Sequence, residues 1–337
     1  MKIVKFAGVL LVFFAVFMGV YYVVSATQSP TSVLSPKGST EKLAKTKPSD
    51  LATKSGLNAS DKTTFLVLGI DRRSKGEGYR TDIMILVTID KVKNRAVLVS
   101  VPRDLWWKTG RINATYVQDG FEEMQRALEE ITGLKPEKFI LTDFADFSWI
   151  VDSMGGVPVE VETTFTDSQY PVDATHEYQT VSFTQGSEVL SGERALIFSR
   201  SRKGDNDSGD WGRMKRQHLI LKGMLKAVDQ PSSIFKNMEL GKAFDMVTKG
   251  RMDTNLTLSD ASYLWDLHKD YEKYTISSLY LDYDYLFTPP MEEYGGAWVL
   301  APIGDSYSNF KLAVQDELNG VKKPVVEEAS TKETTNP

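Results

Sequence analysis

Short runs of apolar, β-branched residues alternate with longer stretches of helical periodicity along most of this chain. Three such runs follow one another closely and predict neighbouring strands over 64–70, 83–89 and 95–101. The residues between the last two runs, 90–94, are polar and predict a hairpin connection. The middle runs are apolar on successive positions, which indicates strands that are buried on both faces of a sheet.

Helical spacing of apolar residues recurs in the rest of the chain. This spacing predicts helices over 121–132, 145–154, 211–228, 259–270 and 310–318. A further strand is predicted near 276–281. Gly133 and Gly155 follow the first two helices, in the position where glycine commonly ends a helix. Interleaved strands and helices predict the α/β class, with a central sheet covered by helices on both faces.

A continuous apolar run stands near the N-terminus, from Phe6 to Ala26. As a helix it would span roughly 31 Å, about the thickness of a bilayer core. Lys2 and Lys5 precede it, and no charge follows until Lys37, so residues 1–5 are expected in the cytoplasm. The run predicts a single-pass transmembrane signal-anchor over 6–26 with an extracytoplasmic body. Because 24–26 resembles a cleavage site, a cleaved signal peptide is the alternative.

Two polar stretches bound the predicted globular part. Residues 27–62 are rich in Ser, Thr, Lys and Pro and predict a flexible extracytoplasmic linker. Residues 322–337 are similarly polar and predict a disordered tail. One folded domain is therefore expected over 63–321.

Composition removes several kinds of chemistry. The chain has no cysteine, which excludes disulfides, thiolate zinc sites and cysteine nucleophiles, and it has only three histidines. A hard-cation site built from carboxylates is therefore more available than a histidine-rich one. The net charge of −5 opposes nucleic-acid binding. Neither the phosphate-loop motif of ATPases nor the Gly-x-Ser-x-Gly motif of hydrolases occurs.

Arginines and aspartates gather where the predicted strands end. Asp71 follows the first strand, Arg80 and Asp82 stand at the start of the second, and Arg103-Asp104 follows the third. Functional groups in α/β folds tend to lie at such strand ends. A second set of polar residues comes much later and comprises Arg200, Arg202, Asp205, Asp207, Asp210, Arg213, Arg216 and Gln217.

The helix predicted from Trp211 gives the sharpest physical indication. A helix N-terminus carries about half a positive charge, so Arg213 and Arg216 in its first turns are unfavourable unless an anion lies there. Arg213 and Gln217 share one face, and free amide groups at the helix start add to a phosphate-binding end. The alternative is that the nearby aspartates neutralise these arginines.

These residue types suit a pyrophosphate. The planar fork of arginine donates to two phosphate oxygens at once. Asp71 and Asp82 could supply hard oxygen ligands to Mg²⁺, which usually takes one or two carboxylates together with substrate phosphates and water.

The order of the motifs resembles the LytR–CpsA–Psr family of cell-envelope glycopolymer ligases. The matching stretches are 67–71 (VLGID), 79–84 (YRTDIM), 99–104 (VSVPRD), 111–114 (RINA), 151–157 (VDSMGGV), 190–196 (LSGERAL), 200–202 (RSR) and 212–217 (GRMKRQ). They run in order through about residue 230 of the chain and are far more specific together than any one alone. Lys203 and Arg72 depart from the family pattern, which commonly has histidine and serine there.

The resemblance implies a central mixed sheet, a function and a set of site residues. Family members transfer anionic glycopolymers, such as teichoic acid or capsule, from an undecaprenyl-pyrophosphate carrier to peptidoglycan, outside the membrane. By analogy Asp71 and Asp82 would hold Mg²⁺ (or Mn²⁺), and Arg103, Asp82 and Asp104 would be catalytic. The pyrophosphate would be held by Arg80, Arg103, Arg200, Arg202, Arg213 and Gln217.

The fate of the polyprenyl chain and the reaction outcome stay open at this point. Family members bury the lipid tail in an apolar pocket, for which the helix residues Leu219, Ile220, Leu221, Met224 and Leu225 are candidates, with ordinary core packing as the equal alternative. A polyprenyl-pyrophosphate pyrophosphatase, with water as acceptor, would need the same groups. A non-catalytic polyprenyl-phosphate-binding regulatory protein is the third hypothesis.

Overall fold

A computed structural model describes the residues 61–70, 80–172, 177–206, 209–227, 253–257, 260, 263–264, 267 and 271–321. The predicted transmembrane segment, the predicted tail and Asp71 lie outside these residues, as does nearly all of the predicted linker. Within the described part, no helix is both long enough and apolar enough to cross a bilayer.

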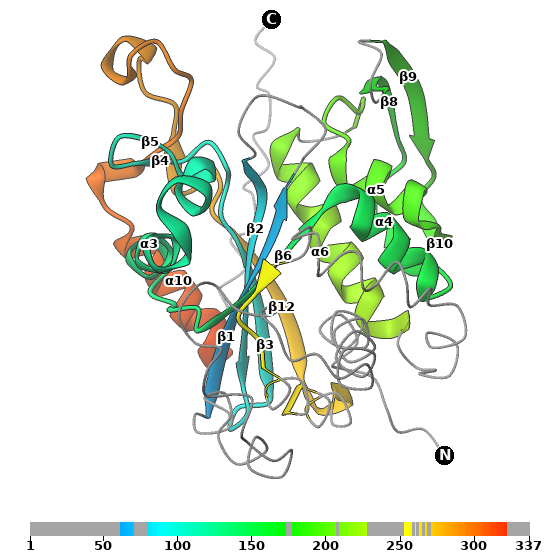
Figure 1. Cartoon of the computed structure of the whole chain (residues 1–337), viewed down its shortest axis with the longest axis horizontal. Coiled ribbons are helices and arrows are strands. Elements are labelled where there is room, and N and C mark those ends of the chain that lie inside the picture. Colours follow the sequence, from blue (N-terminus) through cyan, green and yellow to red (C-terminus); the bar gives the residue numbers. More distant parts are fainter. Residues whose placement is uncertain are drawn as a thin grey trace, which may run out of the picture.

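A six-stranded mixed sheet forms the centre of the fold (Figure 1). Its strand order is β11-β6-β1-β2-β3-β12. The strands β1, β2 and β3 pair antiparallel, whereas β6 runs parallel to β1 and β12 runs parallel to β3. Their bounds are β1 Lys62–Ile70, β2 Thr81–Asp90, β3 Arg95–Ser100, β6 Lys138–Asp143, β11 Asp253–Thr254 and β12 Thr275–Tyr280. The three closely spaced strands and the strand near 276–281 are confirmed.

One end of this sheet collects the loops of interest. The last residue of β1, Ile70, pairs both with Thr81 at the start of β2 and with Asp143 at the end of β6. Ser100 at the end of β3 pairs with Tyr280 at the end of β12. The segments that begin β2 and that follow β3, β6 and β12 therefore share one edge, as the strand-end argument requires.

Helices cover both faces of the sheet, as predicted (Figure 1). One face carries α3 Thr115–Thr132 and α10 Ser308–Asn319, and the other carries α4 Phe144–Ser153, α5 Gly192–Arg200 and α6 Asp210–Ala227. Consecutive strand residues point to opposite faces, so Phe65 belongs to the core beneath α4–α6 and Leu66 to the core beneath α3 and α10. Two apolar cores therefore sandwich the sheet.

Most helix predictions hold to within a few residues. Only the helix predicted over 121–132 is clearly longer, because α3 begins at Thr115 and continues through a kink at Gly120 (φ 81°). Gly133 takes the left-handed conformation (φ 72°) that ends α3. Of the helix predicted over 259–270, only 260, 263–264 and 267 are described, and all of them are helical.

Several elements were not predicted from the sequence. β6 lies inside the sheet, and two antiparallel two-stranded pairs, β7–β10 and β8–β9, lie on the side of the fold that carries α4–α6. The bounds of the elements not yet given are β4 Trp106–Trp107, β5 Gly110–Arg111, η3 Ile112–Ala114, β7 Val157–Val161, β8 Phe165–Pro171, β9 Tyr178–Phe183, β10 Gly186–Leu190, η4 Tyr271–Lys273, β13 Leu286–Phe287, η5 Met291–Tyr294, β14 Ala301–Pro302 and η6 Ile303–Asp305.

A close approach fixes α6 on β7. A Cβ atom added to Gly223 would lie 2.3 Å from the Pro158 carbonyl oxygen and 2.6 Å from a Val157 methyl carbon. Helix and strand therefore meet through the glycine itself, and the position of α6 depends on this contact.

Gly223→Ala should lower the free energy of unfolding by about 1–3 kcal/mol, because the helix must move away from β7 to admit a methyl group. Gly110→Ala is the matched control, since no atom lies within 4 Å of its added Cβ, and it should change stability by less than about 1 kcal/mol. Chemical denaturation measures both. Equal shifts for the two variants would show that α6 does not depend on this contact.

Candidate functional site: arginines balanced by aspartates

Arg103 stands at the centre of one half of the site, on the turn that follows β3. Its Nη1 lies 3.0 Å from Asp82 Oδ1 at the start of β2, and its Nε lies 3.2 Å from Asp104 Oδ2. The buried Asp104 carboxylate also lies 3.5 Å from Arg111 Nε. Three residues that the resemblance assigns to catalysis are thus in direct contact.

The backbone of this turn is fixed from two sides. Arg103 O accepts a hydrogen bond from Asn113 N (3.3 Å), and Asp104 O accepts one from Leu300 N (3.0 Å). Asn113 O in turn accepts from the hydroxyl of Thr81 at 3.0 Å. Because the turn is tied to Leu300 and to η3, and η3 is tied to β2, the backbone that carries Arg103 is held at the sheet edge.

The other half of the site lies at the start of α6. Asp210, the first residue of that helix, accepts a hydrogen bond from Nη2 of Arg202 on its Oδ2 at 2.7 Å, and its Oδ1 forms an ion pair with Nε of the same arginine, also at 2.7 Å. Its Oδ1 also lies 3.2 Å from Arg213 Nη2. Asp210 therefore does what the neutralisation alternative proposed, in that it pairs with two arginines. Asp207 lies outside the described residues.

Arg213 is a buried cation with incomplete pairing. Only 8% of its surface is exposed, and its Nε has no hydrogen-bond partner among the described residues. Burial lowers the pKa of Arg213 to about 10; Asp210 opposes this shift, and the charges of Arg103 and Arg202 reinforce it. The side chain remains charged at neutral pH. A bound anion would therefore offset the free-energy cost of burying that charge and its repulsion by the neighbouring arginines.

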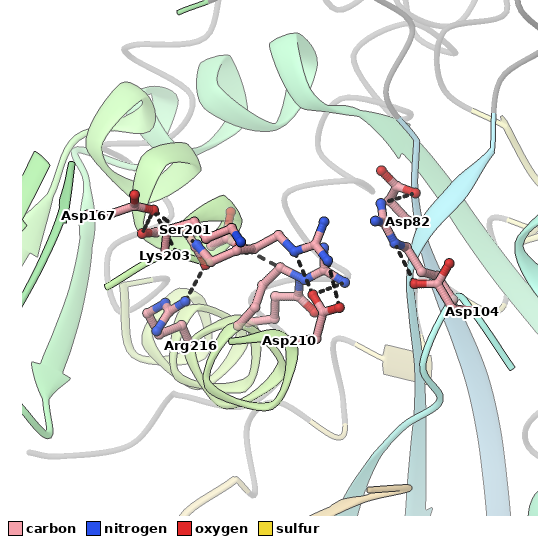
Figure 2. A network of polar contacts seen from close by, with 12 residues as sticks. Asp82, Asp104, Asp167, Ser201, Lys203, Asp210 and Arg216 are labelled. Atoms are coloured by element: carbon pink, nitrogen blue, oxygen red, sulfur yellow. Dashed lines mark hydrogen bonds and ion pairs between the residues drawn. The ribbon is translucent and has the colours of Figure 1, made fainter. Parts of the chain in front are cut away.

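The two halves act on one another electrostatically. Burial alone would lower the pKa of Arg103, but Asp82, Asp104 and Asp210 outweigh that effect and raise the pKa above its usual value. Asp210 on α6 and Asp82 on β2 therefore stabilise the same guanidinium. Figure 2 shows Asp82 and Asp104 on one side of the network, with Asp210 facing them from the helix.

The remaining predicted phosphate ligands are restrained to different degrees. Arg80 is exposed, directly before β2. Arg200 donates to the hydroxyl of Tyr170 at 3.0 Å and lies 5.3 Å from the centre of the Phe144 ring. Gln217 is buried, and its amide donates to Ser199 O at 3.3 Å.

Arg216 has a different role from the one that the helix-start argument gave it. Its Nε donates to Phe198 O at 2.8 Å, its Nη2 donates to Ser201 O, and its guanidinium lies 4.7 Å from the centre of the Phe165 ring. These carbonyls belong to the end of α5 and the residue after it, where a cation stabilises the helix dipole. Arg216 therefore joins α6 to α5, and an anion is not needed to explain it.

Asp167 on β8 is a site residue that sequence reasoning missed. It is 1% exposed, and its Oδ2 accepts from Ser201 Oγ (2.5 Å), Arg202 N (3.1 Å) and Lys203 N (3.2 Å), as Figure 2 shows. Burial alone would raise the pKa of Asp167, but hydrogen bonds from Ser201, Lys203, Gln169 and Arg202 lower it below the usual value. Asp167 therefore fixes the backbone that presents Arg202. No motif in the sequence marks it.

Of the two carboxylates expected to hold a metal ion, the structure describes only Asp82. Among the described residues no group of three or more His, Asp or Glu side chains surrounds a common point. Asp82 is one half-buried carboxylate, with Oδ1 turned to Arg103, and Asp71 lies outside the described residues. One carboxylate at a phosphate site is compatible with Mg²⁺, which fills its other positions with phosphate oxygens and water.

Asp167→Asn should lower the free energy of unfolding at pH 7 by about 2 kcal/mol, because amide N–H groups replace an oxygen that accepts three hydrogen bonds. The lowered pKa means that the carboxylate stabilises fully above its unfolded value of about 3.9 and less as pH falls below it. The difference from the unmodified protein should therefore shrink below about pH 4 in urea titrations. The exposed Asp119→Asn is the control; a pH-independent difference for Asp167→Asn would contradict the charge-based account.

Proteins of known description are similar to this chain in sequence and in fold. The family model described as the LytR_cpsA_psr family matches residues 21–315. A Bacillus subtilis protein called polyisoprenyl-teichoic acid–peptidoglycan teichoic acid transferase TagU is 30% identical over 222 residues, which is 64% of this chain and 66% of that protein. TagV of the same organism, described in the same way, is 29% identical over 240 residues, 68% of this chain and 59% of that protein.

The fold likeness extends to solved structures. A structure described as TagT bound to LI-WTA superposes with a TM-score of 0.58 at 22% identity, covering 79% of this chain and 94% of that one. The mixed sheet with helices on both faces is therefore a shared architecture. Since the family model spans most of the chain, including every described arginine and aspartate of the site, the protein belongs to the LytR_cpsA_psr family.

Proposed function

We propose that this protein is a phosphotransferase that moves an anionic glycopolymer of the teichoic acid or capsule type from a polyprenyl-pyrophosphate carrier to peptidoglycan. The observation that carries this is the incompletely paired Arg213 at the start of α6, with Arg202 on the same aspartate and Arg103 across from it. The names of TagU and TagV, two teichoic acid transferases, support it. The predicted 6–26 anchor would hold the domain at the extracytoplasmic face of the cell membrane.

The arginine cluster suits a pyrophosphate because its positive charges are paired with carboxylates whose place a ligand can take. Asp210 occupies Arg202 and Arg213, and Asp82 occupies Arg103, at distances of 2.7–3.2 Å. Phosphate oxygens make the same charge-assisted bonds in greater number and from a single ligand. The pyrophosphate would take over these donors, with the backbone held by Asp167 keeping Arg202 in place.

The reaction is a displacement at phosphorus. A hydroxyl oxygen of the acceptor sugar attacks the phosphorus that bears the glycan, and the bond from that phosphorus to the bridging oxygen breaks. Polyprenyl phosphate leaves with the bonding electrons, and the hydroxyl proton passes to a base. Arginines that face the developing negative charge lower the barrier. Asp82 and Asp104 are the candidates for the base, and Asp82 is the more exposed, with 23% of its side chain accessible against 8%.

Mg²⁺ (or Mn²⁺) is proposed as the cofactor, held by Asp82 together with Asp71. When bound, it would neutralise charge on the phosphate oxygens. The contribution of this chain is then to place a carboxylate beside Arg103, within the same network that binds the phosphates.

Arg103→Lys should reduce transfer at least about 100-fold, since lysine keeps the charge but cannot bridge Asp82, Asp104 and substrate as a planar fork does. The exposed Arg126→Lys is the control and should leave the rate unchanged. Purified protein is mixed with lipid-linked polymer and peptidoglycan, and the products are identified. Glycan joined to peptidoglycan supports the proposal; free phosphorylated glycan indicates a pyrophosphatase, and lipid bound without turnover indicates a regulatory binding protein.

Asp82→Asn should raise the Mg²⁺ concentration needed for half-maximal activity by about tenfold or more, because a neutral amide is a weaker ligand for a hard cation. Asp104→Asn is the matched control, since it also removes a carboxylate from Arg103 but is not a proposed metal ligand. Activity is titrated against Mg²⁺ for both variants. An identical Mg²⁺ requirement in the two variants would exclude Asp82 from the metal site.

A further inference from the structure

Two aromatic side chains meet beside the arginine cluster, and the proposed chemistry uses neither. The rings of Trp211 on α6 and Tyr283 after β12 lie edge to face, with centroids 4.9 Å apart and planes at 79°. Tyr283 is 53% exposed, whereas Trp211 is partly buried against the core under α3 and α10. A half-buried indole therefore supports an exposed phenol ring, although burying that ring would be more favourable for folding.

The pair lies on the same edge of the sheet as the phosphate-binding arginines. Trp211 directly follows Asp210, which binds Arg202 and Arg213. On the other side, Leu281 N donates to Ser100 O at 3.0 Å, so the end of β12 is tied to the end of β3. Tyr283 follows β12 by three residues, as Arg103 follows β3.

A carboxylate accompanies the rings. Asp282 is half-buried at the end of β12, directly before Tyr283, and its Oδ1 accepts from Asp284 N at 3.1 Å. Burial raises the pKa of Asp282 and the charge of Asp284 adds to this, while Lys215 on α6 opposes it. The carboxyl group thus directly precedes Tyr283 in the chain and is influenced by the charge of Lys215 on α6, and it has lone pairs available for further hydrogen bonds.

Aromatic rings with an adjacent carboxylate suit a sugar. The face of an aromatic ring is electron-rich and attracts the weakly positive C–H groups on the face of a pyranose. A carboxylate accepts from neighbouring sugar hydroxyls. In a donor of the proposed kind, the first sugar is bonded to a phosphate, so it must lie close to the arginines that hold the pyrophosphate. Trp211 directly follows Asp210, which pairs with Arg202 and Arg213, and Tyr283 contacts Trp211.

We propose that Trp211, Tyr283 and Asp282 form the subsite that holds the first sugar of the donor glycan, next to its pyrophosphate. This assignment rests on the proposed function and adds to it a means of recognising the glycan as well as the lipid. Tyr283 supplies the stacking face, Trp211 fixes its angle, and Asp282 accepts hydrogen bonds from the sugar.

The test compares two lipids on the full-length protein in detergent. One is polyprenyl pyrophosphate, and the other is the same lipid bearing a single N-acetylglucosamine. Tyr283→Ala should weaken binding of the sugar-bearing lipid about fivefold, the value of one lost aromatic contact, and leave the sugar-free lipid unaffected. Tyr283→Phe, which keeps the ring, should bind both lipids as the unmodified protein does. Tyr178→Ala, at a tyrosine on β9 that is 67% exposed, is the control.

The outcomes separate this inference from the function on which it rests. An unchanged ratio of the two affinities in Tyr283→Ala would overturn the sugar subsite, as would an effect confined to the KM of the peptidoglycan acceptor. Failure of the unmodified protein to bind sugar-free polyprenyl pyrophosphate would instead contradict the proposed function.

Discussion

The sharing of one carboxylate, Asp210, between Arg202 and Arg213 is the interaction on which the site depends. Arg213 is buried near a helix N-terminus, where burial, the helix dipole and the neighbouring arginines all disfavour its positive charge. Asp210 makes that position tolerable in the absence of ligand, and Asp82 and Asp104 do the same for Arg103. The cluster is therefore stable when empty but incompletely satisfied, which is the condition for binding a multiply charged anion.

The scaffold serves to keep these charges in position. Asp167 fixes the backbone that carries Arg202, Arg216 joins α6 to the end of α5, and Gly223 allows α6 to lie directly on β7. Asp167 contacts the backbone of Arg202, whereas the contacts of Arg216 and Gly223 are made with α5 and β7. Each restrains an element that presents an arginine, so the distances between charges follow from packing that extends well beyond the site.

The sequence predicted what depends on local pattern. The apolar runs of β1 to β3 and the glycine that ends α3 marked their elements, and ordered motifs marked Arg103, Arg202 and Arg213. β6 was not predicted because its three apolar residues are closely followed by α4 and show no period of their own. Asp167 and the inward turn of Arg216 depend on contacts between segments about 20–35 residues apart, which no spacing within one segment reveals. Which arginine pairs with which aspartate likewise depends on tertiary contacts that the sequence does not show.

The central claim is that the arginine cluster binds the pyrophosphate of a polyprenyl lipid, and mass spectrometry of lipid extracted from the purified full-length protein tests it most directly. The account predicts a co-purifying polyprenyl phosphate or pyrophosphate that is absent from Arg213→Met, a variant that keeps an apolar stem in the buried position. Protein that carries no such lipid and fails to bind it when it is added would contradict the account, and the arginines would then serve only to hold α5, α6 and the sheet edge together.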